Sequence, residues 1–191
     1  LAKKFNSGEK KDDSPNESNI PSIQKIALIG NSESGKTTFI KRIFNGVFNR
    51  EYGPTISGEL ISIEQTFNNQ KIKFNFRDTS GIKLYHEDAD LVLIFVDLSK
   101  NIDQQLTTWF GIFKEATNSK TKAMVILSRS ELASKDQNIE SIKYHINQSI
   151  EDDLELSGRV TLFKNPISSQ SISDEEILEF ENEMYRVIMP A

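Results

Sequence analysis

The stretch Gly30-Asn31-Ser32-Glu33-Ser34-Gly35-Lys36-Thr37 decides how this chain folds and what it can bind. It follows the short apolar segment 23–29 and precedes the helix-like segment 37–44, so it occupies a turn between a strand and a helix. In the G-x-x-x-x-G-K-[ST] pattern, glycines let the backbone curl until successive N–H groups converge on phosphate oxygens at a helix N-terminus. The pattern therefore predicts a phosphate-binding loop, against the alternative of a chance glycine-lysine turn.

Individual residues of this loop have expected roles. Lys36 would reach the β- and γ-phosphates of a nucleotide, and the hydroxyl of Thr37 would coordinate Mg²⁺. The further phosphate-binding residues that we predict in this stretch are Gly30, Glu33, Ser34, Gly35 and Thr38.

Composition excludes several classes of protein. The 191 residues include no cysteine, which removes disulfide frameworks, thiolate zinc sites and lipid-modified cysteines as possibilities. The longest purely apolar run, 91–96, is far shorter than the roughly 20 residues that span a bilayer. With 23 basic and 28 acidic side chains, the net charge of −5 argues against a nucleic-acid binder. We expect a cytoplasmic or nuclear protein without a membrane anchor on this chain.

The order of apolar segments predicts a three-layer α/β domain. Residues 1–22 are mostly charged or small and polar, so we expect a flexible polar tail there and one domain over 23–191. Segments that read as strands alternate with helical ones, which favours a mostly parallel six-stranded sheet covered on both faces. The expected strands are 23–29, 59–67, 71–77, 91–96, 123–127 and 160–163.

Two of these strands and three helices have more specific signals. Segments 59–67 and 71–77 are joined by a short polar connection, which predicts an antiparallel hairpin at the edge of the sheet. Ser173 and Glu176 form a capping box before the last helix. Apolar residues at helical spacing mark the core faces of the three helices: Leu106, Trp109, Phe110 and Phe113; Ile139, Ile142, Ile146 and Ile150; Ile177, Phe180, Met184 and Ile188.

Two further motifs carry a family resemblance. Thr55 ends Tyr52-Gly53-Pro54-Thr55, 18 residues after Thr37, and Asp78 begins Asp78-Thr79-Ser80-Gly81, 41 residues after Thr37. These motifs and spacings resemble the small GTPases of the Ras superfamily, a P-loop G domain, and locally they are most similar to its Ran members. The stretch ESGKTT alone looks more like heterotrimeric Gα subunits.

The resemblance implies the cofactors GTP or GDP and Mg²⁺. By that resemblance, Thr55 would bind Mg²⁺ through its hydroxyl and the γ-phosphate through its amide, and Asp78 would hold Mg²⁺ through water. The amide of Gly81 would bond the γ-phosphate, and Phe48 would place its ring against the guanine. Groups that contact only the γ-phosphate are released when it is lost, which would make the domain an order–disorder switch.

The base-binding motif departs from the family pattern. Where the family has N-K-x-D, this chain has Ser128-Arg129-Ser130-Glu131. Glu131 retains a carboxylate that can accept from guanine N–H groups, and Arg129 can lie over the base, whereas Ser128 cannot replace the asparagine amide. Ser168, Ser169 and Gln170 resemble the S-A-K loop. We expect guanine rather than adenine; taken alone, residues 128–131 would be an ordinary polar loop.

The sequence departs most from the family pattern at the position of the catalytic glutamine. Ile82 stands where most of these enzymes have the glutamine that orients the attacking water, so no catalytic residue is assigned and intrinsic hydrolysis should be slow. His86 and Glu87 could replace it, or could be solvated loop residues. The segment 82–90 is also short for a second switch.

Two hypotheses follow. The first is a monomeric switch that binds Mg-GTP, hydrolyses it slowly and meets effectors and regulators through its switch loops, with Ran-like nuclear transport suggested by the local resemblance. The second is a pseudo-GTPase, a scaffold that binds nucleotide without turnover or not at all.

Overall fold

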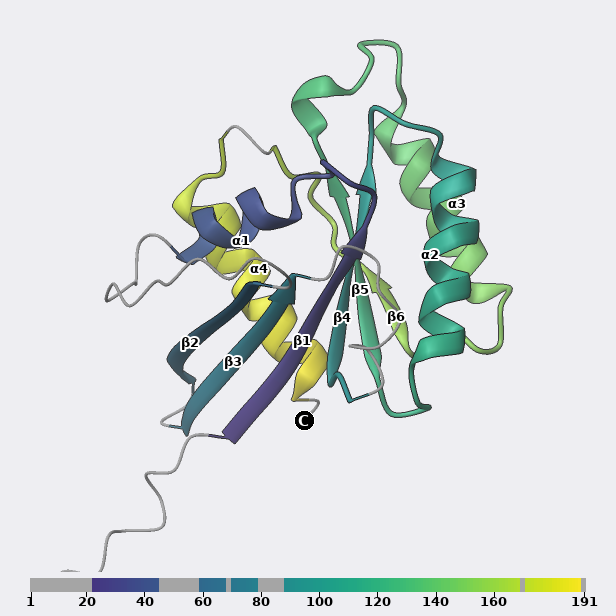
Figure 1. The fold of residues 1–191 in the computed structure, drawn as a ribbon. Helices are drawn as coiled ribbons and strands as arrows, with labels where there is room; N and C mark the ends of the chain where they lie inside the picture. The colour runs from purple at the N-terminus through teal and green to yellow at the C-terminus, as the bar shows by residue number, and fades with distance from the viewer. Residues whose placement is uncertain (1–21, 45–58, 68–69, 79–87, 169–170, 190–191) are drawn as a thin grey trace, which may run out of the picture.

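The computed structural model describes residues 22–44, 59–67, 70–78, 88–168 and 171–189. Within them the chain forms one six-stranded sheet in the order β2-β3-β1-β4-β5-β6 (Figure 1). Only the pairing of β2 with β3 is antiparallel, which confirms the mostly parallel sheet with an antiparallel hairpin at its edge. The strands are β1 Ser22–Gly30, β2 Glu59–Phe67, β3 Gln70–Asp78, β4 Leu91–Asp97, β5 Lys122–Ser128 and β6 Val160–Leu162.

Helices cover both faces of this sheet, as predicted. Figure 1 shows α1 and α4 on one side and α2 and α3 on the other. The α-helices are α1 Lys36–Phe44, α2 Ile102–Ala116, α3 Ile139–Glu151 and α4 Asp174–Ile188, and a short 3-10 helix, η3, spans Ser130–Leu132. None of the helices in the described ranges has the length and apolar composition to cross a membrane.

The apolar spacing of the helices correctly predicts their core faces. Leu106, Trp109, Phe110 and Phe113 of α2 are all buried against the strands that α2 covers. In α4, Phe180 and Met184 are buried. The predicted capping box is also present: Ser173 Oγ accepts from the amide of Glu176 at 3.2 Å, and the Glu176 carboxylate accepts from the amide of Ser173 at 2.7 Å.

Aromatic contacts fix α1, and with it the loop that precedes it. Phe39 meets Phe95 of β4 edge-on, with ring centroids 5.4 Å apart, and meets Phe180 of α4 at 4.9 Å. All three rings are buried, and each such burial contributes about 1.5–3 kcal/mol. Because Phe39 lies one turn into α1, these contacts hold the N-terminus of α1 against the sheet.

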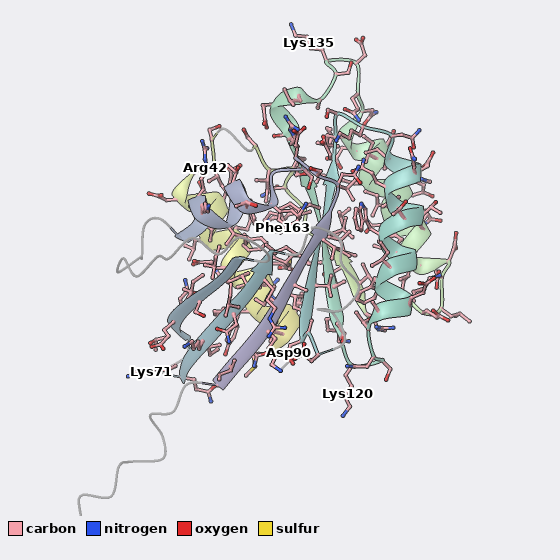
Figure 2. The ribbon with its side chains drawn as sticks, in the orientation of Figure 1. Arg42, Lys71, Asp90, Lys120, Lys135 and Phe163 are labelled. Carbon is pink, nitrogen blue, oxygen red and sulfur yellow. The ribbon has the colours of Figure 1, made fainter. Side chains whose placement is uncertain are left out.

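The strand register brings the carboxyl ends of the three parallel strands β1, β4 and β5 to the same end of the sheet. Gly30 of β1 pairs with Phe95 of β4, and Asp97 of β4 pairs with Ser128 of β5. In open sheets of this kind, ligands bind outside the carboxyl ends of the strands. Figure 2 shows Asp90 and Lys120 at the opposite end of the sheet.

Candidate functional site at the carboxyl ends of the strands

Gly30 ends β1 where no side chain fits. Its φ is +147°, and a Cβ built on it would lie 2.7 Å from the carbonyl oxygen of Phe95 and 2.9 Å from the Cβ of Phe95. Distances below about 3.0 Å do not occur for real Cβ atoms, and a φ in this range strains any L side chain. Glycine is therefore required so that the loop can leave the sheet in close contact with β4.

The loop then turns back and starts a helix. Glu33 and Gly35 have φ values of +63° and +87°. The amide of Ser34 donates to the carbonyl of Asn31 at 3.2 Å, and the amide of Phe39 donates to the carbonyl of Gly35 at 2.8 Å as the first turn of α1. Two left-handed residues on either side of Ser34 produce the curl that the sequence pattern predicts for phosphate binding.

Lys36 places a cation inside this curl. Only 7% of the residue is exposed, and its Nζ donates to the carbonyls of Gly30 at 3.0 Å and Asn31 at 2.8 Å and to Ser34 Oγ at 3.4 Å. Burial of an ammonium group is costly unless oxygen atoms surround it. Thr37 is half-buried and Thr38 exposed in the same first turn of α1.

The loop also contacts α2. The Asn31 side-chain oxygen accepts from the indole Nε1 of Trp109 at 3.2 Å. The helical spacing assigned Trp109 to the core, and the residue is 93% buried. The spacing does not reveal that its indole N–H also hydrogen-bonds the phosphate loop.

The predicted base-binding segment lies beside this loop. Ser130 donates its amide to the carbonyl of Ile167 at 3.2 Å, and Ser128 and Ile167 form a single parallel bridge. Ser168 directly follows Ile167, so the structure brings the 128–131 segment and Ser168 together as the resemblance implies. Glu131 is half-buried in η3.

Ser128 and Arg129 have different surroundings. Ser128 is buried, and its hydroxyl donates to the carbonyl of Val96 at 3.3 Å, which ties β5 to β4. Arg129 has a left-handed backbone with φ of +57°, and its NH1 donates to the carbonyl of Glu33 at 2.8 Å. Arg129 thus connects the predicted base loop to the phosphate loop.

Asp97 lies beside Arg129, although no motif of the sequence points to it. It ends β4, is fully buried, and lies 3.8 Å from Arg129 NH1 and 3.9 Å from Lys100 Nζ through its Oδ2. A signal was available, because Asp97 is the charged residue that ends the all-apolar run 91–96, and charged side chains are rarely buried unless they are paired.

Some predicted site residues lie outside the described residues: Phe48, Thr55, Gly81, Ile82, Ser169 and Gln170, together with His86 and Glu87. For Asp78 the structure describes only the backbone, which ends β3 and pairs with Leu28. Since Leu28 precedes Gly30 by two residues, the end of β3 lies at the base of the phosphate loop.

Comparison with known proteins agrees with this geometry. Residues 25–131, more than half of the chain, match the family model described as "Ras of Complex, Roc, domain of DAPkinase". The chain is 23% identical over 150 residues to the "GTP-binding nuclear protein Ran" of Giardia intestinalis, a match that covers 66% of each protein.

A second relative is the "GTP-binding nuclear protein GSP1" of Encephalitozoon cuniculi, at 27% identity over 124 residues, which cover 59% of this chain and 57% of that protein. The chain therefore spans less than two thirds of the length of both relatives. The matched residues include most of β1, the phosphate loop, β2 to β5 and the segment up to Glu131. The chain belongs to the Roc family of Ras-like small GTPase domains, and this membership implies that it binds a guanine nucleotide.

Proposed function

We propose that this domain is a switch that binds Mg-GTP at the loop of residues 30–37 and hydrolyses it slowly. The observation that carries the proposal is the contact between Arg129 and Glu33, because it joins the two loops to which the resemblance assigns the base and the phosphates. A nucleotide that bridges both loops would find a cation on each, Lys36 and Arg129, in a preformed curl of backbone N–H groups.

Thr37, Thr55 and Asp78 would hold the magnesium ion. The donor set fits, because Mg²⁺ prefers hard oxygen ligands in an octahedral arrangement. Thr37 lies in the first turn of α1, and the backbone of Asp78 ends β3 beside Leu28, two residues before the loop begins. When bound, the ion would neutralise charge on the β- and γ-phosphates.

Glu131 and Arg129 support guanine as the base. A carboxylate accepts hydrogen bonds from the two N–H groups that guanine presents, whereas adenine presents an acceptor at one of these positions. Glu131 is half-buried in η3, two positions after Arg129, which contacts the phosphate loop. Ser168, Ser169, Gln170 and Phe48 complete the base site in this proposal.

Slow turnover follows from Ile82. An aliphatic side chain cannot orient the attacking water, and positioning provides most of the catalysis in phosphoryl transfer. The same residue favours the second hypothesis, a scaffold that binds nucleotide without turnover. The two functions differ in one measurable quantity, the rate of γ-phosphate release by bound GTP.

The decisive experiment identifies the nucleotide that the purified protein carries. The protein is denatured and the released nucleotide is separated by ion-exchange chromatography. Bound GTP supports the binding site with impaired hydrolysis, and bound GDP supports the site and means that turnover occurs despite Ile82. If the protein carries none, titration with Mg-GTP and Mg-ATP decides; failure to bind GTP more tightly than ATP would refute the proposal.

A role in nuclear transport is the finer part of the proposal. It rests on the names of the two relatives, which are at 23% and 27% identity. The test is location: a fluorescent fusion that accumulates in the nucleus in a nucleotide-dependent manner would support it, and exclusion from the nucleus would refute it. Effectors and regulators would bind through the switch loops.

A further inference from the structure

Cationic side chains bind four consecutive carbonyl groups of the phosphate loop. The first two carbonyls of residues 30–33 accept from Lys36, as described above. The third accepts from Lys100 Nζ at 3.4 Å, and the fourth accepts from Arg129 NH1 at 2.8 Å. Lys100 and Arg129 belong to the segments that follow β4 and β5, so they contact the loop from two different parts of the chain.

One buried carboxylate lies between these two cations. Asp97 Oδ2 is 3.9 Å from Lys100 Nζ and 3.8 Å from Arg129 NH1. The other oxygen, Oδ1, accepts from the amide of Ser99 at 2.9 Å and from its hydroxyl at 2.6 Å. Within the described part of the chain, Oδ2 has no hydrogen-bond partner although it is fully buried. The two cations are therefore the groups that compensate its charge.

The backbone of Asp97 is held on both sides. The side chain of Gln105 in α2 accepts from the amide of Asp97 at 2.8 Å and donates to its carbonyl at 2.9 Å. Gln105 is itself buried. These bonds leave the carboxylate little freedom to follow the cations, so it is the cations that must adjust to the carboxylate.

We propose that Asp97 is a positioning residue that holds Lys100 and Arg129 on the carbonyls of Ser32 and Glu33, and thereby sets the phosphate loop in its binding shape before the nucleotide arrives. We call Asp97, Lys100 and Arg129 the carbonyl clamp. In each planar peptide unit the C=O and the following N–H point in opposite directions. Holding the Ser32 carbonyl therefore turns the next amide, that of Glu33, the opposite way, where phosphate oxygens would bind. The amide after the Glu33 carbonyl, that of Ser34, closes the turn of the loop on the carbonyl of Asn31.

The advantage of such a clamp is preorganisation. A loop that is already in its bound shape loses less conformational freedom on binding. This part of the inference rests on the proposed function, but the shape of the empty loop does not. The experiment therefore measures the loop without nucleotide as well as the affinity for nucleotide.

The first measurement is amide hydrogen exchange over residues 31–35 in protein freed of nucleotide with EDTA. Asp97→Asn and Lys100→Gln should each accelerate exchange by roughly tenfold, because exchange reports local opening. Lys120→Gln, at the opposite end of the sheet (Figure 2), is the matched control and should leave these amides unchanged. Wild-type exchange rates in both clamp variants would overturn the inference.

The second measurement separates positioning from general destabilisation. The dissociation constant for fluorescent GDP is determined for Asp97→Asn, Lys100→Gln and the double variant. If Asp97 acts through Lys100, the double variant should bind no more weakly than the Asp97→Asn variant. Losses that multiply would contradict the clamp, because they would show independent contributions.

Two outcomes keep the tests distinguishable. If Asp97→Asn does not fold, Lys100→Gln decides alone, since Lys100 is 42% exposed and its removal should not prevent folding. If the wild-type protein binds no GDP, the proposed function fails while the exchange measurement still decides whether the clamp sets the loop.

Discussion

The guanidinium of Arg129 donates to the carbonyl of Glu33 at 2.8 Å across 96 positions of the sequence. A planar guanidinium presents several N–H groups in fixed directions, so Arg129 can bond this carbonyl and still face the carboxylate of Asp97. The contact makes the segment after β5 a structural neighbour of the segment after β1. The predicted base loop and the predicted phosphate loop are thus in direct contact in the fold.

Lys36→Ala should remove most nucleotide affinity. The ammonium is buried against the carbonyls of the loop in which phosphates would bind, and charge-assisted bonds to phosphate are the strong ones. We expect the dissociation constant for fluorescent GTP to rise by roughly 100-fold or more. Lys41→Ala, further along α1, is the control and should bind as the wild type does. An unchanged affinity in Lys36→Ala would end the phosphate-loop assignment.

Gly30→Ala should destabilise the fold, because its Cβ would meet backbone and Cβ atoms of Phe95 at 2.7 and 2.9 Å. Overpacking of this kind costs about 1–3 kcal/mol. The matched control is Gly111→Ala in α2, where a Cβ would meet nothing within 4 Å. That change should stabilise the protein by about 0.5–1 kcal/mol. Urea unfolding gives the free energy of unfolding of both variants. Equal changes in the two would show that the close approach of β1 and β4 does not require glycine at position 30.

Glu131→Ala should weaken GTP binding more than ATP binding. Loss of a carboxylate that accepts from guanine leaves two base N–H groups without partners and costs about tenfold or more in affinity. Asp136→Ala, an exposed acidic residue shortly after η3, provides the control for net charge. Competition titrations with both nucleotides give the ratio, and equal losses for GTP and ATP would exclude the base contact.

Ile82→Gln should accelerate GTP cleavage in a single turnover by roughly tenfold or more, because an amide can orient the attacking water. Quench-flow measurement of released phosphate tests this without interference from product release. A rate that does not change would assign the slow turnover to the short segment 82–90 instead.

The ion pair between Lys114 and Asp153 should make stability depend on pH. Lys114 Nζ lies 2.8 Å from Asp153 Oδ2 and joins α2 to the residues after α3. The hydrogen bond from Lys114 lowers the pKa of Asp153 below its ordinary value of 3.8, and the same bond raises the pKa of Lys114 above 10.5. The contribution of the Asp153 carboxylate to the free energy of unfolding is therefore fully present above pH 3.8, and it is lost as the pH falls through the lowered pKa of Asp153.

The contribution of the Lys114 ammonium to the free energy of unfolding is fully present below pH 10.5, and it is lost as the pH rises through the raised pKa of Lys114. Lys114→Met should therefore lower the thermal midpoint slightly at neutral pH, and the difference from wild type should vanish in strong acid. The control is Lys143→Met, which removes a pair within α3 whose acidic member, Glu140, is 80% exposed. A difference that persists at all pH values would show that Lys114 acts through packing.

Much of the fold could be read from local pattern. The alternation of apolar strands with amphipathic helices, the edge hairpin and the capping box of α4 were all predicted, because each depends on residues close together in the chain. Some details were not predicted. The 3-10 helix η3 has no apolar periodicity, and β6 ends at Leu162 although a strand up to Phe163 was predicted.

In the candidate site, too, some residues could be assigned from local sequence and others could not. Gly30, Gly35 and Lys36 were assigned from the motif; the structure gives both glycines a positive φ and buries Lys36 against the loop carbonyls, and their role in phosphate binding stays a prediction. Trp109 and Asp97 were missed, since their importance depends on what they face. A tryptophan at helical spacing indicates core, and only the fold shows its indole N–H on Asn31, 78 positions away.

The sequence by itself determined the phosphate loop, the order of strands and helices and the resemblance to small GTPases, because these depend on residue types at short, fixed spacings. Only the tertiary structure decided that Lys100 and Arg129, 68 and 96 positions from their partners in the loop, hold its carbonyls around the buried Asp97. The physical reason is the register of the parallel strands, which brings the carboxyl ends of β1, β4 and β5 to the same end of the sheet.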